Sequence, residues 1–493
     1  MHLIPNLKSV VTKPTRLNPD RILDNIITDL SKWYQTPECL PPLDADPGSG
    51  GKKSDHLIVV MEPISVINNK PARTRREVLV RPMKESGINC FGKWIKQQDW
   101  KEVLEEESMD KKAELFQNLL MNKIDEFLPQ KKRIISSDDQ PFCSQEMKKI
   151  KRLKCREYNK HRRSVKWQTL NNAFKKEVIK AKRRYYKDII KDLKSSKTSQ
   201  WYSKLKKLCS YDQKKSEPIV VESLKHLPLQ EQAEAIADKF CKVSQEYEPL
   251  KTHDIEVPEF DVESIPSLQP RDVQRKLEST ETNKSVPPGD IPPKIAKLFA
   301  KEISFPLCDI INSSIKLGKW SKIYKKESIT PVPKVFPPQS PEELRNISGL
   351  LLFNKIAEGL IAELMISDIS SNLDPSQYAN QKGISLQHYL INMISKILSD
   401  TDKNSSGEIN AVIATLYDWK EAFPRQCPKL GIEAFMKCGV RSSLIPLLIS
   451  YLQDRTMTVK WNGLKSTERK LNGGGPQGAT FGLWEYLVQS NDN

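Results

Sequence analysis

An aspartate at the end of a long apolar run is the residue of this chain best suited to chemistry. Asp418 follows residues 411–417, which read AVIATLY. A run rich in β-branched residues predicts a strand buried on both faces, and a carboxylate at its end could hold a hard cation through oxygen. Residues 419–423 favour a helical turn, so Asp418 lies at a strand-to-helix switch, a common ligand position. An ordinary helix N-cap is the alternative.

A glycine-rich stretch follows this aspartate further along the chain. Residues 472–480 read NGGGPQGAT, and three consecutive glycines let the backbone approach a ligand or another segment closely. Pro476 stiffens the exit from the loop. An ordinary turn is the alternative for such a sequence. Each feature is weak evidence alone, and the two together are stronger evidence.

A second pair of reactive side chains stands near the N-terminus. Asp55 and His56 precede the apolar residues 57–60, which predict a strand. At a strand entrance a carboxylate can orient a cation while an imidazole transfers a proton, as metal-assisted phosphodiester hydrolysis requires. The alternative is a capped strand start with a solvated histidine.

The stretches around Asp418 and residues 475–478 (GPQG), with Phe423 five positions after the aspartate, resemble motifs A and B of reverse transcriptases. The likeness is greatest to those of non-LTR retrotransposons. It implies that Asp418 is a palm ligand of Mg²⁺ (or Mn²⁺) and that Phe423 is the steric gate beneath the incoming sugar. It also implies that Gln477 and Gly478 line the nucleotide pocket.

Lys334 and Arg345 are the candidates for holding the triphosphate of that nucleotide. The Pro-limited edge strand predicted at 328–334 and residues 344–348 (LRNIS) resemble the fingers of the same enzymes, as do residues 289–294 (GDIPPK). The compact ammonium of lysine and the forked guanidinium of arginine both suit phosphate oxygens. Taken alone, each would be an ordinary surface cation.

The N-terminal part carries a separate resemblance. Thr15-Arg16, Leu23-Asp24 and Ser54-Asp55-His56, in this order, resemble the C-terminal end of the endonuclease/exonuclease/phosphatase family, found upstream of many non-LTR reverse transcriptases. The resemblance implies that Asp24 and His56 form an acid/base pair and that Asp55 assists a metal. The family's other active-site positions would precede residue 1, so we expect this remnant not to cleave nucleic acid.

Residues 145–208 are the most basic part of the chain. An apolar stripe through Leu170, Phe174, Val178, Ala181, Tyr185 and Ile189 predicts a helix. Because acidic partners are scarce here, we expect salt-sensitive, sequence-tolerant phosphate binding, and a solvated helix pair is the alternative. The candidate nucleic-acid-binding residues are Lys148, Lys149, Arg162, Arg163, Lys175, Lys182, Arg183, Arg184 and Trp201.

Composition limits the function classes. The 493 residues suffice for two to four domains, and the net charge of +17 favours a polyanionic partner. Nine scattered cysteines without a C-x-x-C pair argue against a zinc site or a disulfide framework. Neither a secretion signal nor a membrane span is evident, so an intracellular setting, cytoplasm or nucleus, is expected.

These observations predict an α+β chain with four regions. Residues 1–65 would be the endonuclease remnant, 66–250 a helical basic linker, 251–345 an extension with the fingers, and 346–493 a partial palm of a right-hand polymerase. Its partners would be an RNA template, a DNA primer or target, and deoxynucleoside triphosphates. The alternative is a non-catalytic nucleic-acid-binding protein that uses helices 145–208.

We expect the chain to be inactive by itself. Two-metal phosphoryl transfer needs more than one carboxylate, and the aromatic-x-Asp-Asp hairpin that follows motif B in the family is not found before residues 491–493. Both ends therefore look truncated.

Overall fold

The computed structural model describes residues 8–17, 20–28, 31–41, 56–64, 75–136, 142–195, 201, 219–282, 284, 286–379, 381, 383–401 and 411–491. Helices and strands are mixed, which confirms the α+β class at that level. The chain forms two compact units. The smaller unit comprises Met1–Arg76 and Ile134–Tyr185, and the larger unit comprises Glu77–Arg133 and Tyr186–Asn493.

The N-terminal part of the smaller unit is built from short antiparallel strand pairs. These are β1 (Lys8–Ser9) with β4 (Ile27–Thr28), β2 (Arg16–Leu17) with β3 (Asp20–Arg21), and β5 (Glu38–Leu40) with β6 (Ile58–Val60). The predicted strand at 57–60 is confirmed. Between β3 and β4, Asp24 and its neighbours have no strand structure.

A helical hairpin forms the other part of the smaller unit. It consists of α4 (Gln145–His161) and α5 (Val165–Ser195), whose last ten residues belong to the larger unit. The predicted apolar stripe of α5 is half-buried at every position, and Trp167 packs on Tyr158 of α4 with ring centroids 5.9 Å apart. The helix prediction is therefore confirmed.

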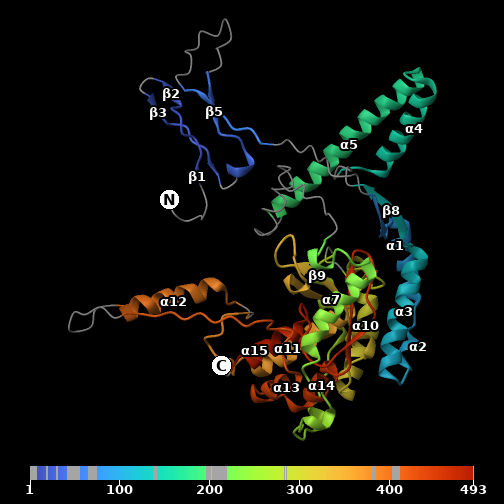
Figure 1. Ribbon diagram of the computed structural model, residues 1–493. Helices are drawn as coiled ribbons and strands as arrows, with labels where there is room; N and C mark the ends of the chain where they lie inside the picture. Colours follow the sequence, from blue (N-terminus) through green and yellow to red (C-terminus); the bar gives the residue numbers. More distant parts are fainter. Residues whose placement is uncertain are drawn as a thin grey trace. The chain divides into compact units, whose positions relative to one another are not determined.

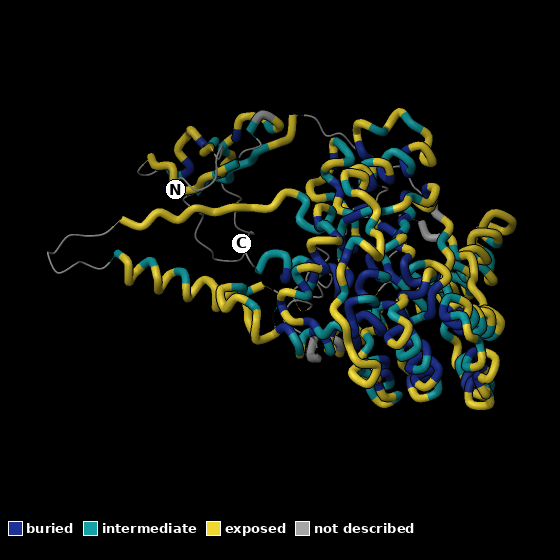
Figure 2. Tube along the Cα trace, turned by 90° about the horizontal axis from the view of Figure 1, so that it is seen from below, coloured by how far each residue is buried: buried dark blue, intermediate teal, exposed yellow. Residues whose placement is uncertain are grey.

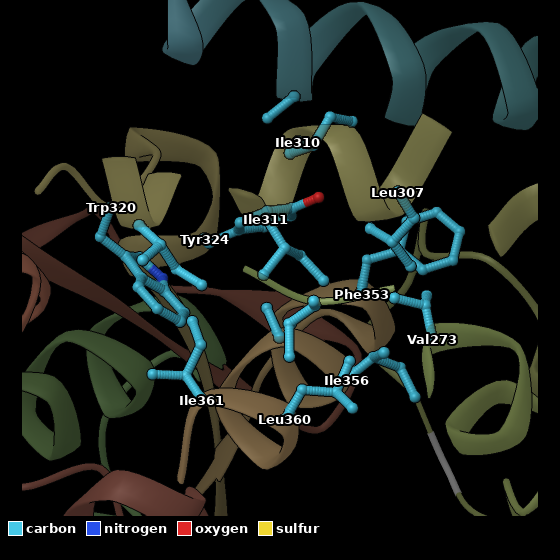
Figure 3. Packing of buried hydrophobic residues seen from close by; sticks show 14 of the residues in the cluster. Val273, Leu307, Ile310, Ile311, Trp320, Tyr324, Phe353, Ile356, Leu360 and Ile361 are labelled. Carbon is cyan, nitrogen blue, oxygen red and sulfur yellow. The ribbon is translucent and has the colours of Figure 1, made fainter. Parts of the chain in front are cut away.

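One hydrophobic core holds the helices of the larger unit together. Its main contributors are α1 (Glu85–Gln97), α3 (Met109–Phe127), α8 (Pro270–Glu278), α10 (Ala300–Leu317), α11 (Leu352–Ile369) and α14 (Ile445–Leu452). Figure 3 shows the centre of this core, where Ile311 and Leu307 of α10 lie near Phe353 of α11. The shorter α2 (Lys101–Leu104), α9 (Pro293–Leu298), α13 (Pro428–Lys437) and α15 (Thr480–Gln489) complete the helical part.

A five-stranded sheet lies in the same unit. Its order is β10 (Leu344–Gly349), β9 (Lys326–Pro333), β11 (Arg455–Trp461) and β12 (Leu464–Lys465), with β13 (Arg469–Leu471) also paired to β11. β9 and β11 are parallel, although 130 residues separate Lys326 from its partner Thr456. Asn462 and Gly463 form the hairpin turn between β11 and β12, and both residues have the positive φ that a two-residue turn of this kind requires.

Helix α7 (Leu229–Ser244) covers the sheet (Figure 1). Ala233, Ile236 and Ala237 of this helix pack on Met457 and Val459 of β11 in a second apolar cluster. The buried residues of α7 recur at helical spacing, so one face of the helix packs on the sheet. No described helix has the length and apolar content needed to cross a membrane.

The buried strand predicted at 411–417 is wrong. Residues 411–419 have no regular secondary structure, and the side chains of Ile413, Leu416 and Tyr417 are 84–91% exposed (Figure 2). The neighbouring α12 (Leu386–Thr401) has no buried residue either. A strand needs a neighbouring strand to pair its backbone hydrogen-bonding groups, whatever its own propensity. No described strand pairs with residues 411–417.

Candidate functional site

The turn that follows Asp418 is hydrogen-bonded to the glycine-rich loop. The amide of Gly474 donates to the carbonyl of Gln426, and the amide of Gly475 donates to the carbonyl of Phe423, both at 2.9 Å. Segments predicted to form one site thus lie side by side. An added Cβ at Gly475 would lie 1.7 Å from Oε1 of Gln426, so this contact requires glycine.

The far end of the loop is attached to β10 and α11. The amide of Ser348 donates to the carbonyl of Gln477 at 3.0 Å, and the amide of Thr480 donates to Oε2 of Glu358 at 3.0 Å. Ser348 also donates its hydroxyl to Oε2 of Glu327 at 2.6 Å. Gln477 therefore sits beside the strand that carries Arg345.

Buried charges lie behind this attachment. Arg455 donates to Oε1 of Glu327 at 3.0 Å, and its guanidinium lies over the ring of Tyr451, whose hydroxyl donates to Glu358 at 3.0 Å. Burial raises the pKa of Glu358, while the Arg455 charge and three hydrogen bonds act in the opposite direction. Through Ser348 and Glu358, this buried network anchors the glycine-rich loop to β10 and α11.

The predicted site residues differ in their surroundings. Phe423 is half-buried and stacks on Tyr486, with ring centroids 5.7 Å apart. Gly478 is exposed, and its φ of +108° favours glycine. Asp418 is exposed on the irregular segment 411–419, in place of the strand mouth expected from the sequence.

Lys334 and Arg345 are both exposed. Lys334 donates its ammonium to the carbonyl of Glu342 at 2.9 Å. Successive side chains of a strand point to opposite faces of the sheet. In β10 the side chain of Arg345 therefore lies on the face opposite to those of Asn346 and Ser348.

A small cavity lies between α7, the sheet and the loop. Ser244, Glu327, Ser348, Pro424 and the glycines at 473–475 are among the lining residues, and the volume is ≈ 20 Å³. This is room for a single water molecule, whereas small-ligand pockets have volumes of about 300–1,000 Å³. A nucleotide would therefore need the outer surface of the loop.

Among the residues that the structure describes, no group of three or more His, Cys, Asp or Glu side chains could hold a metal ion. Asp418 would thus contribute one ligand to a cation, and other groups would have to complete its shell.

Asp24 and His56, the pair that the endonuclease resemblance implies, lie in contact in the smaller unit. Nδ1 of His56 lies 2.7 Å from Oδ2 of Asp24, and this hydrogen bond is the main cause that lowers the pKa of Asp24. Thr15 orients the aspartate, because its hydroxyl accepts the amides of Leu23 and Asp24, both at 3.0 Å. Asp55 lies outside the described residues.

The basic hairpin presents most of its predicted cations to solvent. Lys149, Arg162, Arg163, Lys175, Lys182, Arg183 and Arg184 are exposed. Lys148 is half-buried and donates to the carbonyl of Ile134 at 3.1 Å. Trp201 is 39% exposed. The surface is thus strongly cationic on α4 and α5.

Sequence reasoning missed three contributors to the loop. Ser348 and Glu358 contact it directly, and Ser244 of α7 accepts the amides of Asn472 and Gly473. Glu358 had a readable signal, since it is an acidic residue among apolar residues at helical spacing, Ile356, Leu360 and Leu364. Ser244 had none, because its contact joins positions 228 residues apart.

Comparison with known proteins adds an independent observation. No protein-family model matches the chain. Over 231 residues the chain is 25% identical to the "Probable RNA-directed DNA polymerase from transposon X-element" of Drosophila melanogaster. The match covers 46% of this chain and 25% of that relative, so the chain spans about a quarter of the relative's length. The similarity supports a reverse-transcriptase-like relationship.

Proposed function

We propose that this chain carries the nucleotide- and template-binding part of an RNA-directed DNA polymerase of a non-LTR retrotransposon. The observation that carries the proposal is the pair of backbone hydrogen bonds from Gly474 and Gly475 to the turn after Asp418. It brings together two segments that match separate polymerase motifs, and the similarity to the transposon polymerase agrees with it.

In this proposal Gln477 and Gly478 contact the incoming deoxynucleoside triphosphate, and Phe423 limits the space beneath its sugar. Lys334 and Arg345 hold its phosphates. Asp418 supplies one carboxylate to Mg²⁺ (or Mn²⁺), whose role in the parent reaction is to stabilise charge during attack of a primer 3′-OH.

Nucleotide binding in the presence of a template-primer tests the proposal. We expect Gln477→Ala to weaken binding of a fluorescent deoxynucleoside triphosphate at least fivefold. Gln453→Ala is the matched control, because Gln453 is also half-buried but bonds to Leu250, away from the loop. Equal affinities in wild type and Gln477→Ala would contradict the assigned pocket.

Primer extension with Mg²⁺ tests the expectation of inactivity. We propose that the 493-residue chain binds without extending, because Asp418 alone cannot hold two cations about 4 Å apart. Robust template-dependent synthesis that is lost in Asp418→Asn would overturn this part while supporting the polymerase assignment.

The basic hairpin supports a second candidate, sequence-tolerant nucleic-acid binding without catalysis. The observation in its favour is the exposure of seven predicted cations on or beside α4 and α5. Replacing residues 182–184 with alanine should weaken RNA binding if the hairpin makes the contacts. Unchanged affinity would remove the basis of this candidate.

Asp24 and His56 remain, in our proposal, the acid/base pair of an endonuclease remnant. Incubation of the chain with plasmid DNA and Mg²⁺ should give no nicks. Nicking that disappears in His56→Ala would contradict the proposed inactivity.

A further inference from the structure

We infer that the end of α7 and the turn that follows it, residues 239–247, position both segments of the candidate nucleotide site without touching the nucleotide. The inference rests on the proposed function, and it extends that function to a segment that neither polymerase motif includes. This end of the helix contacts the glycine-rich loop on one side and the turn after Asp418 on the other.

Ser244 is the contact to the loop. Its hydroxyl oxygen accepts the amide of Asn472 at 2.7 Å and the amide of Gly473 at 3.0 Å. The carbonyl of Tyr247 accepts the side-chain amide of Asn472 at 3.1 Å. Because Ser244 is only 3% exposed, water cannot readily replace its hydroxyl as the acceptor.

Lys239 and Tyr247 are the contacts to the turn. The ammonium of Lys239 lies 3.1 Å from Oε1 of Glu421, and the hydroxyl of Tyr247 donates to the carbonyl of Arg425 at 2.7 Å. Arg425 in turn pairs with Glu246 at 2.9 Å. Glu421 has a φ of +56°, a conformation that few non-glycine residues adopt, so these contacts hold an otherwise unfavourable turn.

The ring of Tyr247 also explains the first glycine of the loop. A Cβ at Gly473 would lie 2.3 Å from this ring, so the loop approaches Tyr247 as closely as a backbone can. Tyr247 therefore touches both segments, the loop through its ring and the turn through its hydroxyl. A shift of α7 would move the two together.

The arrangement makes Ser244 and Tyr247 positioning residues. Neither belongs to the predicted nucleotide contacts, yet Phe423 and Gln477 lie on the two segments that they hold. Loss of either contact should weaken binding of the nucleotide more than binding of template-primer, because the cations proposed to contact template-primer belong to α4 and α5, not to the loop or the turn.

Ser244→Ala and Tyr247→Phe test the inference in the full chain. Ser279→Ala is the control, because the Ser279 hydroxyl donates to the carbonyl of Lys276 at the end of α8, in the same unit. Two measurements are made: hydrogen exchange of the peptide 471–478 without ligand, and the affinities for a fluorescent deoxynucleoside triphosphate and for template-primer. Tyr247→Phe keeps the ring and so guards against a failure to fold.

We expect Ser244→Ala to speed exchange of the Asn472 and Gly473 amides about tenfold. Nucleotide affinity should fall at least threefold in Ser244→Ala and in Tyr247→Phe, while their template-primer affinity should stay unchanged. Ser279→Ala should match wild type in both affinities and in exchange. Unchanged exchange, or faster exchange with unchanged nucleotide affinity, would overturn the inference. If wild type binds no nucleotide, the proposed function fails, and the exchange measurement alone decides whether α7 holds the loop.

Discussion

Replacing Glu485 with glutamine should stabilise the larger unit, and the gain should grow with pH. Glu485 lies on α15 and is 1% exposed. Its Oε1 accepts a hydrogen bond from Gln489 at 3.3 Å, while Oε2 has no hydrogen-bond partner among the described residues. Burial raises the pKa of Glu485 to about 8, from 4.5, with Arg455 opposing the effect.

The sign follows from proton binding. Between pH 4.5 and about 8 the unfolded chain loses the Glu485 proton while the folded chain retains it. The free energy of unfolding therefore falls as pH rises through this window, and the full stability is present only below it. At about 1.4 kcal/mol per pKa unit, the cost reaches about 5 kcal/mol above pH 8. Glutamine has nearly the same volume and does not titrate.

The effect is measured by urea unfolding at pH 4.5 and pH 8.5. Unfolding is followed by hydrogen exchange of the peptide 480–489, because the two units need not unfold together and this peptide reports on the larger one. We expect Glu485→Gln to be close to wild type at pH 4.5 and at least 2 kcal/mol more stable at pH 8.5. Glu433→Gln, at an exposed position of α13, is the control. An equal difference at both pH values would refute the reasoning.

Three further changes have defined outcomes. Arg455→Leu leaves Glu327 buried without its cation and should lower the free energy of unfolding by about 3–5 kcal/mol, measured with urea. His56→Ala removes the hydrogen bond that lowers the pKa of Asp24, so NMR titration should show that pKa rising towards its ordinary value. Alanine at all three positions 182–184 should reduce the slope of log K against log salt for RNA by up to about 2–3, and an unchanged slope would show that these cations do not meet phosphate.

Local patterns predicted the elements that a single segment specifies. Helices α3, α7 and α11 are consistent with apolar residues at helical spacing in their own sequences, and the Asn462-Gly463 turn is consistent with dihedral preferences that belong to those two residues. The contact between the turn after Asp418 and the glycine-rich loop was reached only through the family resemblance.

Other features depend on partners that no local pattern names. Residues 411–417 have the composition of a buried strand, yet the outer edge of β10 receives Gln477, and the other described strands pair among themselves. Likewise, nothing in the sequence around Ser244 indicates that its hydroxyl accepts amides from Asn472 and Gly473. Burial pattern predicts which face of a helix packs, and it does not predict what lies against that face.

The parallel pairing of β9 with β11 has a consequence for synthesis of the protein. β9 leaves the ribosome about 130 residues before the strand that completes its hydrogen bonding, an interval of about 7–26 s at common translation speeds. Until then the β9–β10 hairpin and the apolar side of α7 lack the strand on which they both pack. The nascent chain therefore exposes unpaired backbone groups of β9 and the apolar side of α7 during that interval.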